Sequence, residues 1–164
     1  MDFDFELLLK KQGELDELIH QNHHVTYETT KTKRLLAYLV ELGELANATK
    51  AFKFWSLKPS ESRERLLDEY ADGLHFLLSL VLAYRYELPV INLETEDEFD
   101  VTESFIACYQ SMASFSKTQS KADLFTAFTD FIALGQALSF TKEDVFAAYE
   151  NKLVVNYQRQ KDHY

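Results

Sequence analysis

The stretch Glu41-Leu-Gly-Glu-Leu-Ala-Asn47 places two carboxylates three residues apart in a sequence otherwise rich in Leu, Ala and Val. The stretch Glu69-Tyr-Ala-Asp72 repeats the arrangement, and 24 residues separate it from Glu44. Because residues three apart share a face of an α-helix, the spacing predicts two helices that each carry an acidic pair on a mostly apolar side. A connection of about ten residues lets two such helices pack antiparallel, which would bring the pairs together.

Carboxylates that are desolvated side by side either take up protons or need a cation between them. Hard oxygen ligands in this number suit Mg²⁺, which keeps several waters and is usually completed by substrate phosphates. We therefore predict a Mg²⁺ site and an enzyme that acts on phosphates. In the alternative interpretation the pairs are solvated helix faces. Their carboxylates would then pair with Lys33, Arg34, Arg65 or Arg85.

The composition predicts one domain spanning residues 1–164, since 46% of the chain is hydrophobic. The net charge of −10 leaves no broad basic surface for a nucleic-acid polymer. Cys108 is the single cysteine, so no disulfide framework is expected. The sequence lacks the basic start of a signal peptide, and no apolar run is long enough to span a membrane. We expect the cytoplasm of a cell or of a virus-infected host.

Periodic apolar residues predict an all-α helical bundle of about six helices. Only four Gly and two Pro interrupt the chain, and no segment alternates as a strand. Capping patterns are found at Thr95–Glu98, Ser120–Asp123 and Thr141–Asp144. The helices are expected at residues 3–20, 28–52, 61–87, 95–115 and 120–139, and from 141 toward the C-terminus.

Aromatic residues at helical spacing in the second half predict core positions or a dimer interface. They are Phe105, Tyr109, Phe115, Phe125, Phe128, Phe131, Phe146 and Tyr149. Because they exceed what the core of a bundle of this size needs, we expect a homodimer.

The acidic pairs and their neighbours resemble a known family. Glu-x-x-Glu followed by Glu-x-x-Asp is similar to the signature of the all-α nucleoside triphosphate pyrophosphatases, the MazG-like superfamily. The blocks 41–47, 52–56 and 69–76 resemble the dimeric dUTPases, and residues 149–160 resemble their last helix. Gln12, which precedes Leu15-Asp-Glu-Leu18, matches a glutamine of the family's first helix. The resemblance covers residues 7–164 in outline and is specific over 41–76.

The resemblance implies roles for particular residues. The Mg²⁺ ligands and catalytic acids would be Glu41, Glu44, Glu69 and Asp72. The deoxyuridine pocket would be lined by Gln12, Trp55, His75 and Phe76. The phosphates or sugar would be approached by Lys152, Asn156 and Arg159. By the residues alone, Trp55 could also be a packed loop anchor, His75 a structural histidine, and the two cations of the last helix surface salt-bridge partners.

These residues together predict a dUTP diphosphatase, which hydrolyses dUTP to dUMP and pyrophosphate with Mg²⁺, and dUDP is a further candidate substrate. One alternative is a related pyrophosphatase for dCTP or another nucleoside triphosphate. A second alternative is a catalytically idle helical protein that binds a protein partner. The resemblance also implies a homodimer in which the last helix approaches the partner's nucleotide.

Overall fold

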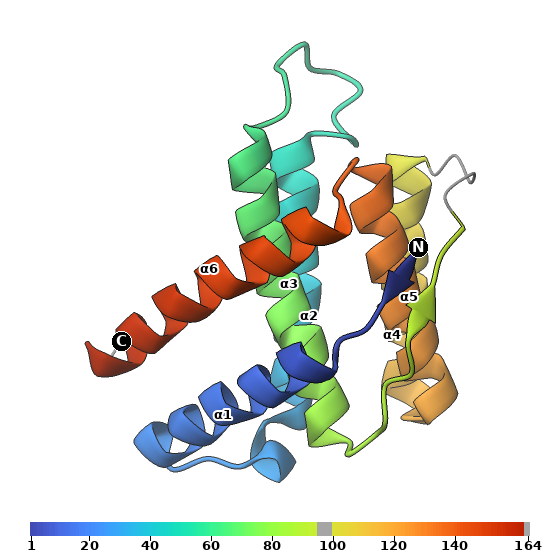
Figure 1. The fold of residues 1–164 in the computed structure, drawn as a ribbon. Helices are drawn as coiled ribbons and strands as arrows, with labels where there is room; N and C mark the ends of the chain where they lie inside the picture. The colour runs from blue at the N-terminus through green and yellow to red at the C-terminus, as the bar shows by residue number, and fades with distance from the viewer. Residues whose placement is uncertain (95–99, 163–164) are drawn as a thin grey trace.

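The computed structural model describes residues 1–94 and 100–162, which form six helices and two very short strands (Figure 1). The elements in chain order are β1 Asp2–Phe3, α1 Glu6–His23, α2 Tyr27–Thr49, α3 Arg63–Ala83, β2 Ile91–Asn92, α4 Val101–Thr118, α5 Lys121–Ala137 and α6 Lys142–Lys161. The predicted all-α architecture is therefore confirmed.

Side-chain caps determine where several helices begin. Ser120 accepts a hydrogen bond from the backbone N–H of Asp123, as predicted. Thr141 and Asp144 cap α6 reciprocally, which confirms the predicted capping box there. The capping box predicted at 95–98 lies outside the described residues, and α4 is capped by Asp100 instead.

The two strands were not predicted from the sequence. β1 pairs antiparallel with β2, with Asp2 opposite Asn92 and Phe3 opposite Ile91. Phe3 and Ile91 are each 1% exposed, so this small ribbon closes one side of the core. Because Phe3 belongs to a strand, α1 begins at Glu6 rather than at residue 3. Strands of two residues are too short for an alternating pattern to be recognised.

The central helix is α3, which packs against α1, α2, α5 and α6 (Figure 1). α2 lies alongside α3 in the antiparallel arrangement predicted from the short connection. Gly73 lets α5 approach closely, because a Cβ at this position would lie 2.9 Å from the Phe131 ring. That ring stacks on Tyr70 at 4.3 Å between centroids. This contact fixes the position of α3, and with it the side chains of the second acidic pair.

The aromatic residues of the second half lie mostly in the core of the single chain. Five of them are buried: Phe105, Phe115, Phe128, Phe131 and Tyr149. Phe125 and Phe146 are partly buried against the same core. The expectation that this stripe exceeds the needs of one chain is therefore wrong, because α4 and α5 pack on each other, α4 also packs on α2 and α5 on α3, and these contacts bury most of the stripe. Only Tyr109 of the group is exposed, at 37%.

Within residues 1–94 and 100–162, no single helix is both long and apolar enough to cross a membrane. α5 and α6 together pass the same test of length and composition, but they meet at 108°.

Candidate active site

Helices α1, α2, α3 and α6 surround a cavity of about 640 Å³. Such a volume is typical of sites for small molecules and cofactors. One part of its wall is acidic and comes from α2 and α3, and another part is formed by polar side chains of α1 and α3. The residues predicted to bind the substrate can be placed around this cavity one by one.

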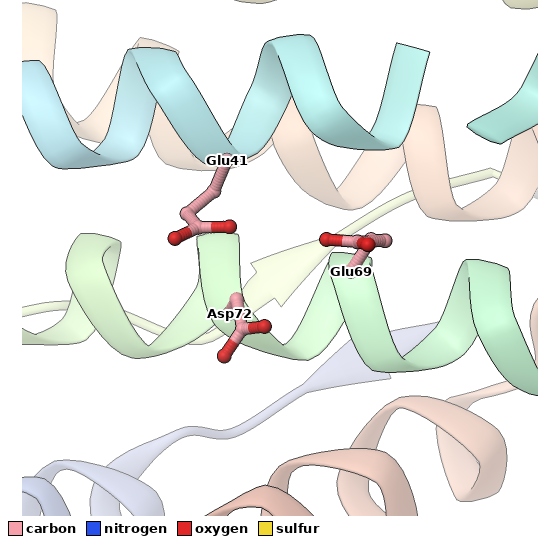
Figure 2. A group of neighbouring side chains, drawn as sticks. All are labelled: Glu41, Glu69 and Asp72. Carbon is pink, nitrogen blue, oxygen red and sulfur yellow. The ribbon is translucent and has the colours of Figure 1, made fainter. Parts of the chain in front are cut away.

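The acidic wall contains three carboxylates that face one another. Glu41 of α2 and Glu69 and Asp72 of α3 offer oxygen atoms that all lie within 4.8 Å of one another. Figure 2 shows Glu41 and Glu69 in the space between the two helices, with Asp72 beside them on α3. Glu44 lines the same cavity but does not belong to this group of three. The structure thus brings three of the four predicted ligands together and leaves the fourth one helical turn away.

Glu44 lies between two hollows of the surface. Together with Glu69 it lines the main cavity and also a smaller one of about 430 Å³, to which Asn47 contributes. Its carboxylate is near enough to Glu41 to raise the pKa of that group. Glu44 is therefore part of the acidic wall, at its outer edge.

The negative charge of the three carboxylates is only partly neutralised by the protein. Burial, followed by the charges of Asp72 and Glu44, raises the pKa of Glu41 from its ordinary value of 4.5 to about 7. Burial also raises the pKa of Glu69 and of Asp72. Glu41 Oε2 is buried and has no hydrogen-bond partner among the described residues. A buried acceptor without a donor is costly, and it points to a cation as the missing partner.

Two basic side chains neutralise part of the acidic wall. Lys152 of α6, only 4% exposed, lies 2.8 Å from Asp72 Oδ2 and 2.7 Å from Asp68 Oδ1. Arg65 forms an ion pair with Glu69 and lies 3.3 Å from Asp68 Oδ2. Burial alone would lower the pKa of Lys152, but its hydrogen bonds with Asp68 and Asp72 raise it. Asp68 was missed by the sequence analysis, although it lies one turn before Asp72 on the same helix.

This donor set fits a divalent cation. Carboxylate oxygens are the ligands that Mg²⁺ takes in proteins, usually one or two of them together with water and phosphate oxygens. Neither Lys152 nor Arg65 reaches Glu41, so the unpartnered oxygen stays available. Of the four cations that could have paired with the predicted ligands, only Arg65 does so in the described part of the chain.

The polar part of the wall contains Gln12 and His75, together with Phe76. His75 is stacked on Tyr149, with ring centroids 4.2 Å apart, and its Nε2 lies 3.3 Å from the Tyr149 carbonyl oxygen. Burial lowers the pKa of His75 to about 4, so the imidazole is neutral at physiological pH. A neutral imidazole that donates from Nε2 keeps Nδ1 as an acceptor, and Nδ1 has no partner among the described residues.

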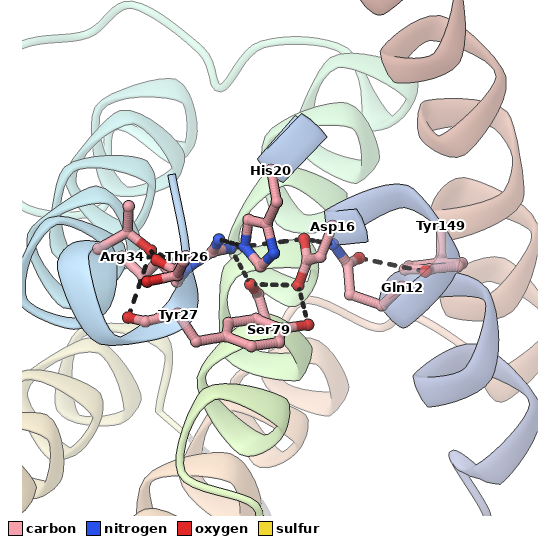
Figure 3. Close-up of polar contacts among 9 residues, drawn as sticks. Gln12, Asp16, His20, Thr26, Tyr27, Arg34, Ser79 and Tyr149 are labelled. Carbon is pink, nitrogen blue, oxygen red and sulfur yellow. Dashed lines mark hydrogen bonds and ion pairs between the residues drawn. The ribbon is translucent and has the colours of Figure 1, made fainter. Parts of the chain in front are cut away.

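A polar network whose members Asp16, Arg34 and Ser79 also line the cavity was not predicted from the sequence. Asp16, 1% exposed, accepts hydrogen bonds from Ser79 at 2.7 Å and from Tyr27 at 2.9 Å. Arg34 lies 3.4 Å from the same carboxylate and donates to His20 Nε2 at 2.7 Å. Figure 3 shows how these contacts tie α1, α2 and α3 together. The sequence offers no signal for the network, because its members are spread over more than sixty residues.

The last helix contributes three of the predicted residues to the cavity. Lys152, Asn156 and Arg159 all line it. Arg159 Nη1 donates to Asn156 Oδ1 at 3.3 Å, so the two side chains are positioned as a pair. Salt bridges, the alternative interpretation for Lys152, are also present, and the structure is compatible with both roles.

Trp55 does not line the cavity. It lies in the connection between α2 and α3, is 64% exposed, and packs edge-on against Phe54 and Phe52. Phe54 and Leu57 of the same connection are almost fully exposed, at 93% and 104%. Trp55 is therefore not the core anchor that the alternative interpretation required, and it approaches the cavity only if this connection changes position.

A cavity of this volume, lined by acids of α2 and α3 together with amide and imidazole groups, is typical of an enzyme that acts on a small polar molecule. The chain belongs to the all-α dUTPase family, whose profile, described as dUTPase, matches residues 4–164. It is accordingly a dUTP diphosphatase. The family generally uses a divalent metal. A search of curated proteins found no match to the chain.

Proposed function

We propose that Glu41, Glu69 and Asp72 bind Mg²⁺ and that Glu44 completes the acidic wall during the hydrolysis of dUTP. The observation that carries the proposal is the convergence of three carboxylates within 4.8 Å, one of them with an unpartnered buried oxygen. Mg²⁺, when bound, supplies neutralisation of the phosphate charge and lowers the pKa of a coordinated water.

The four acids have two tasks in this proposal. The three converging carboxylates position the triphosphate by holding its counterion, and their own repulsion is relieved in doing so. Glu44, at the outer edge of the wall, orients the water that attacks the α-phosphorus. Attack there releases pyrophosphate and leaves dUMP. Most of the catalytic effect comes from positioning and charge stabilisation, because phosphoryl transfer requires little covalent chemistry from the protein.

The residues of α6 are proposed to bind the negative charge of the substrate. Lys152 and Arg159 line the same cavity as the acids, and Asn156 lies between them on the helix. A triphosphate offers these cations stronger charge-assisted hydrogen bonds than the acids that they contact now. A Lys152→Ala variant should therefore raise KM for dUTP. A loss of stability without a change in KM would favour the purely structural role.

The nucleoside is proposed to lie against Gln12, His75 and Phe76. All three line the cavity, and both polar side chains are almost completely buried. A buried polar wall rejects ligands that leave its groups unpaired, so the pocket is expected to prefer dUTP over dCTP. Trp55 is proposed to join this pocket when substrate binding moves its loop.

The working unit is proposed to be a homodimer. The support comes from an apolar patch that the structure leaves uncovered, rather than from the aromatic stripe. Leu36 and Val40 of α2, with Ile106 and Tyr109 of α4, are 60%, 50%, 53% and 37% exposed. Tyr109 donates to the Leu39 carbonyl oxygen, which holds the two helices together as one surface. Light scattering at micromolar concentration tests the proposal, and a fully active monomer would refute it.

The remaining partners follow from charge and chemistry. A nucleotide is the proposed ligand, with dUDP as a second substrate to be tested, and the net charge of −10 disfavours a nucleic-acid polymer or an anionic membrane surface. We also propose a cytoplasmic location, where the free, buried Cys108 stays reduced.

The test is to replace each acid by its amide and measure turnover of dUTP. Glu41→Gln, Glu44→Gln, Glu69→Gln and Asp72→Asn should each nearly abolish turnover while the helical circular dichroism stays unchanged. Glu143→Gln, on the exposed first turn of α6, serves as a matched control outside the cavity. Normal activity in two or more of the four variants would overturn the metal site. If the four variants lose activity but the wild type also hydrolyses other nucleoside triphosphates, the protein would instead be a less selective pyrophosphatase.

A further inference from the structure

The side-chain amide of Gln12 is held at both ends. Its Nε2 donates to Asp16 Oδ1 at 2.9 Å, and its Oε1 accepts a hydrogen bond from the Tyr149 hydroxyl at 3.2 Å (Figure 3). Gln12 is only 3% exposed, yet it lines the cavity. Both contacts therefore act on a buried group at the end of the site where the nucleoside is proposed to lie.

The chemistry of Asp16 determines which way the amide points. Asp16 is a carboxylate that accepts from Ser79 and Tyr27 and pairs with Arg34, so it can only accept from Gln12. The Tyr149 hydroxyl has one proton for the Leu8 carbonyl oxygen and Gln12 Oε1, and its own oxygen can accept, so it tolerates either orientation of the amide. Turning the amide over would bring its oxygen against the Asp16 carboxylate, so the contact with Asp16 is the one that fixes the orientation.

A fixed amide presents a fixed order of donor and acceptor to a ligand. The network uses one of its two N–H groups and one of its two lone pairs, which leaves one of each for another partner. Uracil offers O4 as an acceptor beside the N3–H donor. Cytosine offers the N4 amino donor beside the N3 acceptor, which is the reverse order. An amide that is free to turn can pair with both bases, whereas an amide held in one orientation pairs well with only one.

We propose that Asp16 is a positioning residue that determines base specificity by fixing the orientation of the Gln12 amide. The inference rests on the proposed function in one respect, namely that Gln12 faces the base. Since the chain hydrolyses dUTP, the fixed order is the one that matches uracil. Cytosine would then meet donor with donor and acceptor with acceptor in a buried site, and such a mismatch costs about tenfold to a hundredfold in affinity.

The test compares the binding of dUMP and dCMP by isothermal calorimetry in the absence of metal. These ligands report on the base end without requiring turnover. Asp16→Asn keeps one acceptor oxygen, which the Ser79 and Tyr27 hydroxyls hold at the Oδ2 position, so its amide N–H group faces Gln12 and the constraint is removed. The dUMP-to-dCMP affinity ratio should fall by about tenfold in this variant. An unchanged ratio in a folded Asp16→Asn protein would overturn the proposal.

Two further variants separate orientation from stability. Tyr27→Phe removes one donor to Asp16 Oδ2 but leaves Oδ1 facing Gln12, so the ratio should stay within about twofold of the wild type. A fall as large as that of Asp16→Asn would mean that the ratio follows the stability of the network, which would overturn the proposal. Tyr149→Phe keeps the ring on His75 and the Asp16–Arg34 pair, and it frees only the other end of the amide. The dUMP-to-dCMP affinity ratio should fall by a smaller factor in Tyr149→Phe than in Asp16→Asn. Tyr149→Phe serves as the test of the proposal if Asp16→Asn does not fold.

The wild-type protein distinguishes this inference from the proposed function. Pyrophosphate release from dUTP together with equal binding of dUMP and dCMP would reject the role of Asp16 and leave the hydrolase intact. Absence of both hydrolysis and nucleotide binding would reject the two together.

Discussion

Replacing Glu41 by Gln should stabilise the metal-free protein at pH 8, because it removes one negative charge from a crowded site. Glu41 has a pKa of about 7 in the folded protein against an ordinary value of 4.5. Between these two pH values the folded state holds a proton that the unfolded state has released. The free energy of unfolding of the wild type therefore decreases as the pH rises from about 4.5 to about 7.

The size of the effect follows from the same two numbers. The difference between 4.5 and about 7 corresponds to about 3 kcal/mol when each tenfold step in proton affinity is worth about 1.4 kcal/mol. Glu41 is only partly buried, so solvent screening reduces this upper limit to about 1–2 kcal/mol. Gln has nearly the same shape and no charge, so Glu41→Gln should gain about this amount at pH 8 and almost nothing near pH 4.5.

The assay is urea unfolding followed by circular dichroism at pH 8 and pH 5, with EDTA present throughout. Glu143→Gln, on the first turn of α6 and outside the cavity, is a matched control that should show no gain at pH 8. A Glu41→Gln protein that is less stable than the wild type at pH 8 would refute the reasoning. A gain of equal size at both pH values would also do so, since it would show that ionisation is not the cause.

Three other predictions test the acidic wall, the loop and the subunit arrangement. Adding Mg²⁺ should raise the melting temperature of the wild type, and the increase should be lost in Asp72→Asn; an unchanged melting temperature in the wild type would favour a catalytically idle protein. A dUTP analogue with Mg²⁺ should change the fluorescence of Trp55, the single tryptophan, more than dCTP does, whereas equal responses to all deoxynucleotides would contradict its role in base recognition. Mixing Glu44→Gln subunits with Lys152→Ala subunits should restore no activity, because Glu44 and Lys152 of one chain line the same cavity, and recovery would show that each site draws on both chains.

The sequence was sufficient to predict the helices and the acidic wall. Glu41, Glu69 and Asp72 could be predicted because residues three apart on one helix lie on the same face. Two matched pairs on consecutive helices then required only antiparallel packing to meet. Glu44 obeys the same spacing, but a carboxylate one turn further along α2 lies at the edge of the group of three, and only the crossing of the helices determines this.

The polar network around Asp16 could not be predicted in the same way. Asp16, Arg34 and Ser79 come from three different helices, and no periodicity connects them. The prediction that the aromatic residues exceed the needs of one chain was wrong for a related reason. Helical spacing identifies Phe128 and Phe131 as residues that need burial, but it does not say whether the covering surface belongs to the same chain or to another. Only the packing of α5 against α3 supplies that answer.

The central claim is that this chain hydrolyses dUTP at a metal site formed by α2 and α3. The measurement that tests it most directly is the release of pyrophosphate from dUTP by purified protein, with Mg²⁺ and with EDTA in its place. The protein should release equal amounts of dUMP and pyrophosphate from dUTP with Mg²⁺ and almost none with EDTA. Equal release in both conditions, or release of orthophosphate in place of pyrophosphate, would contradict it.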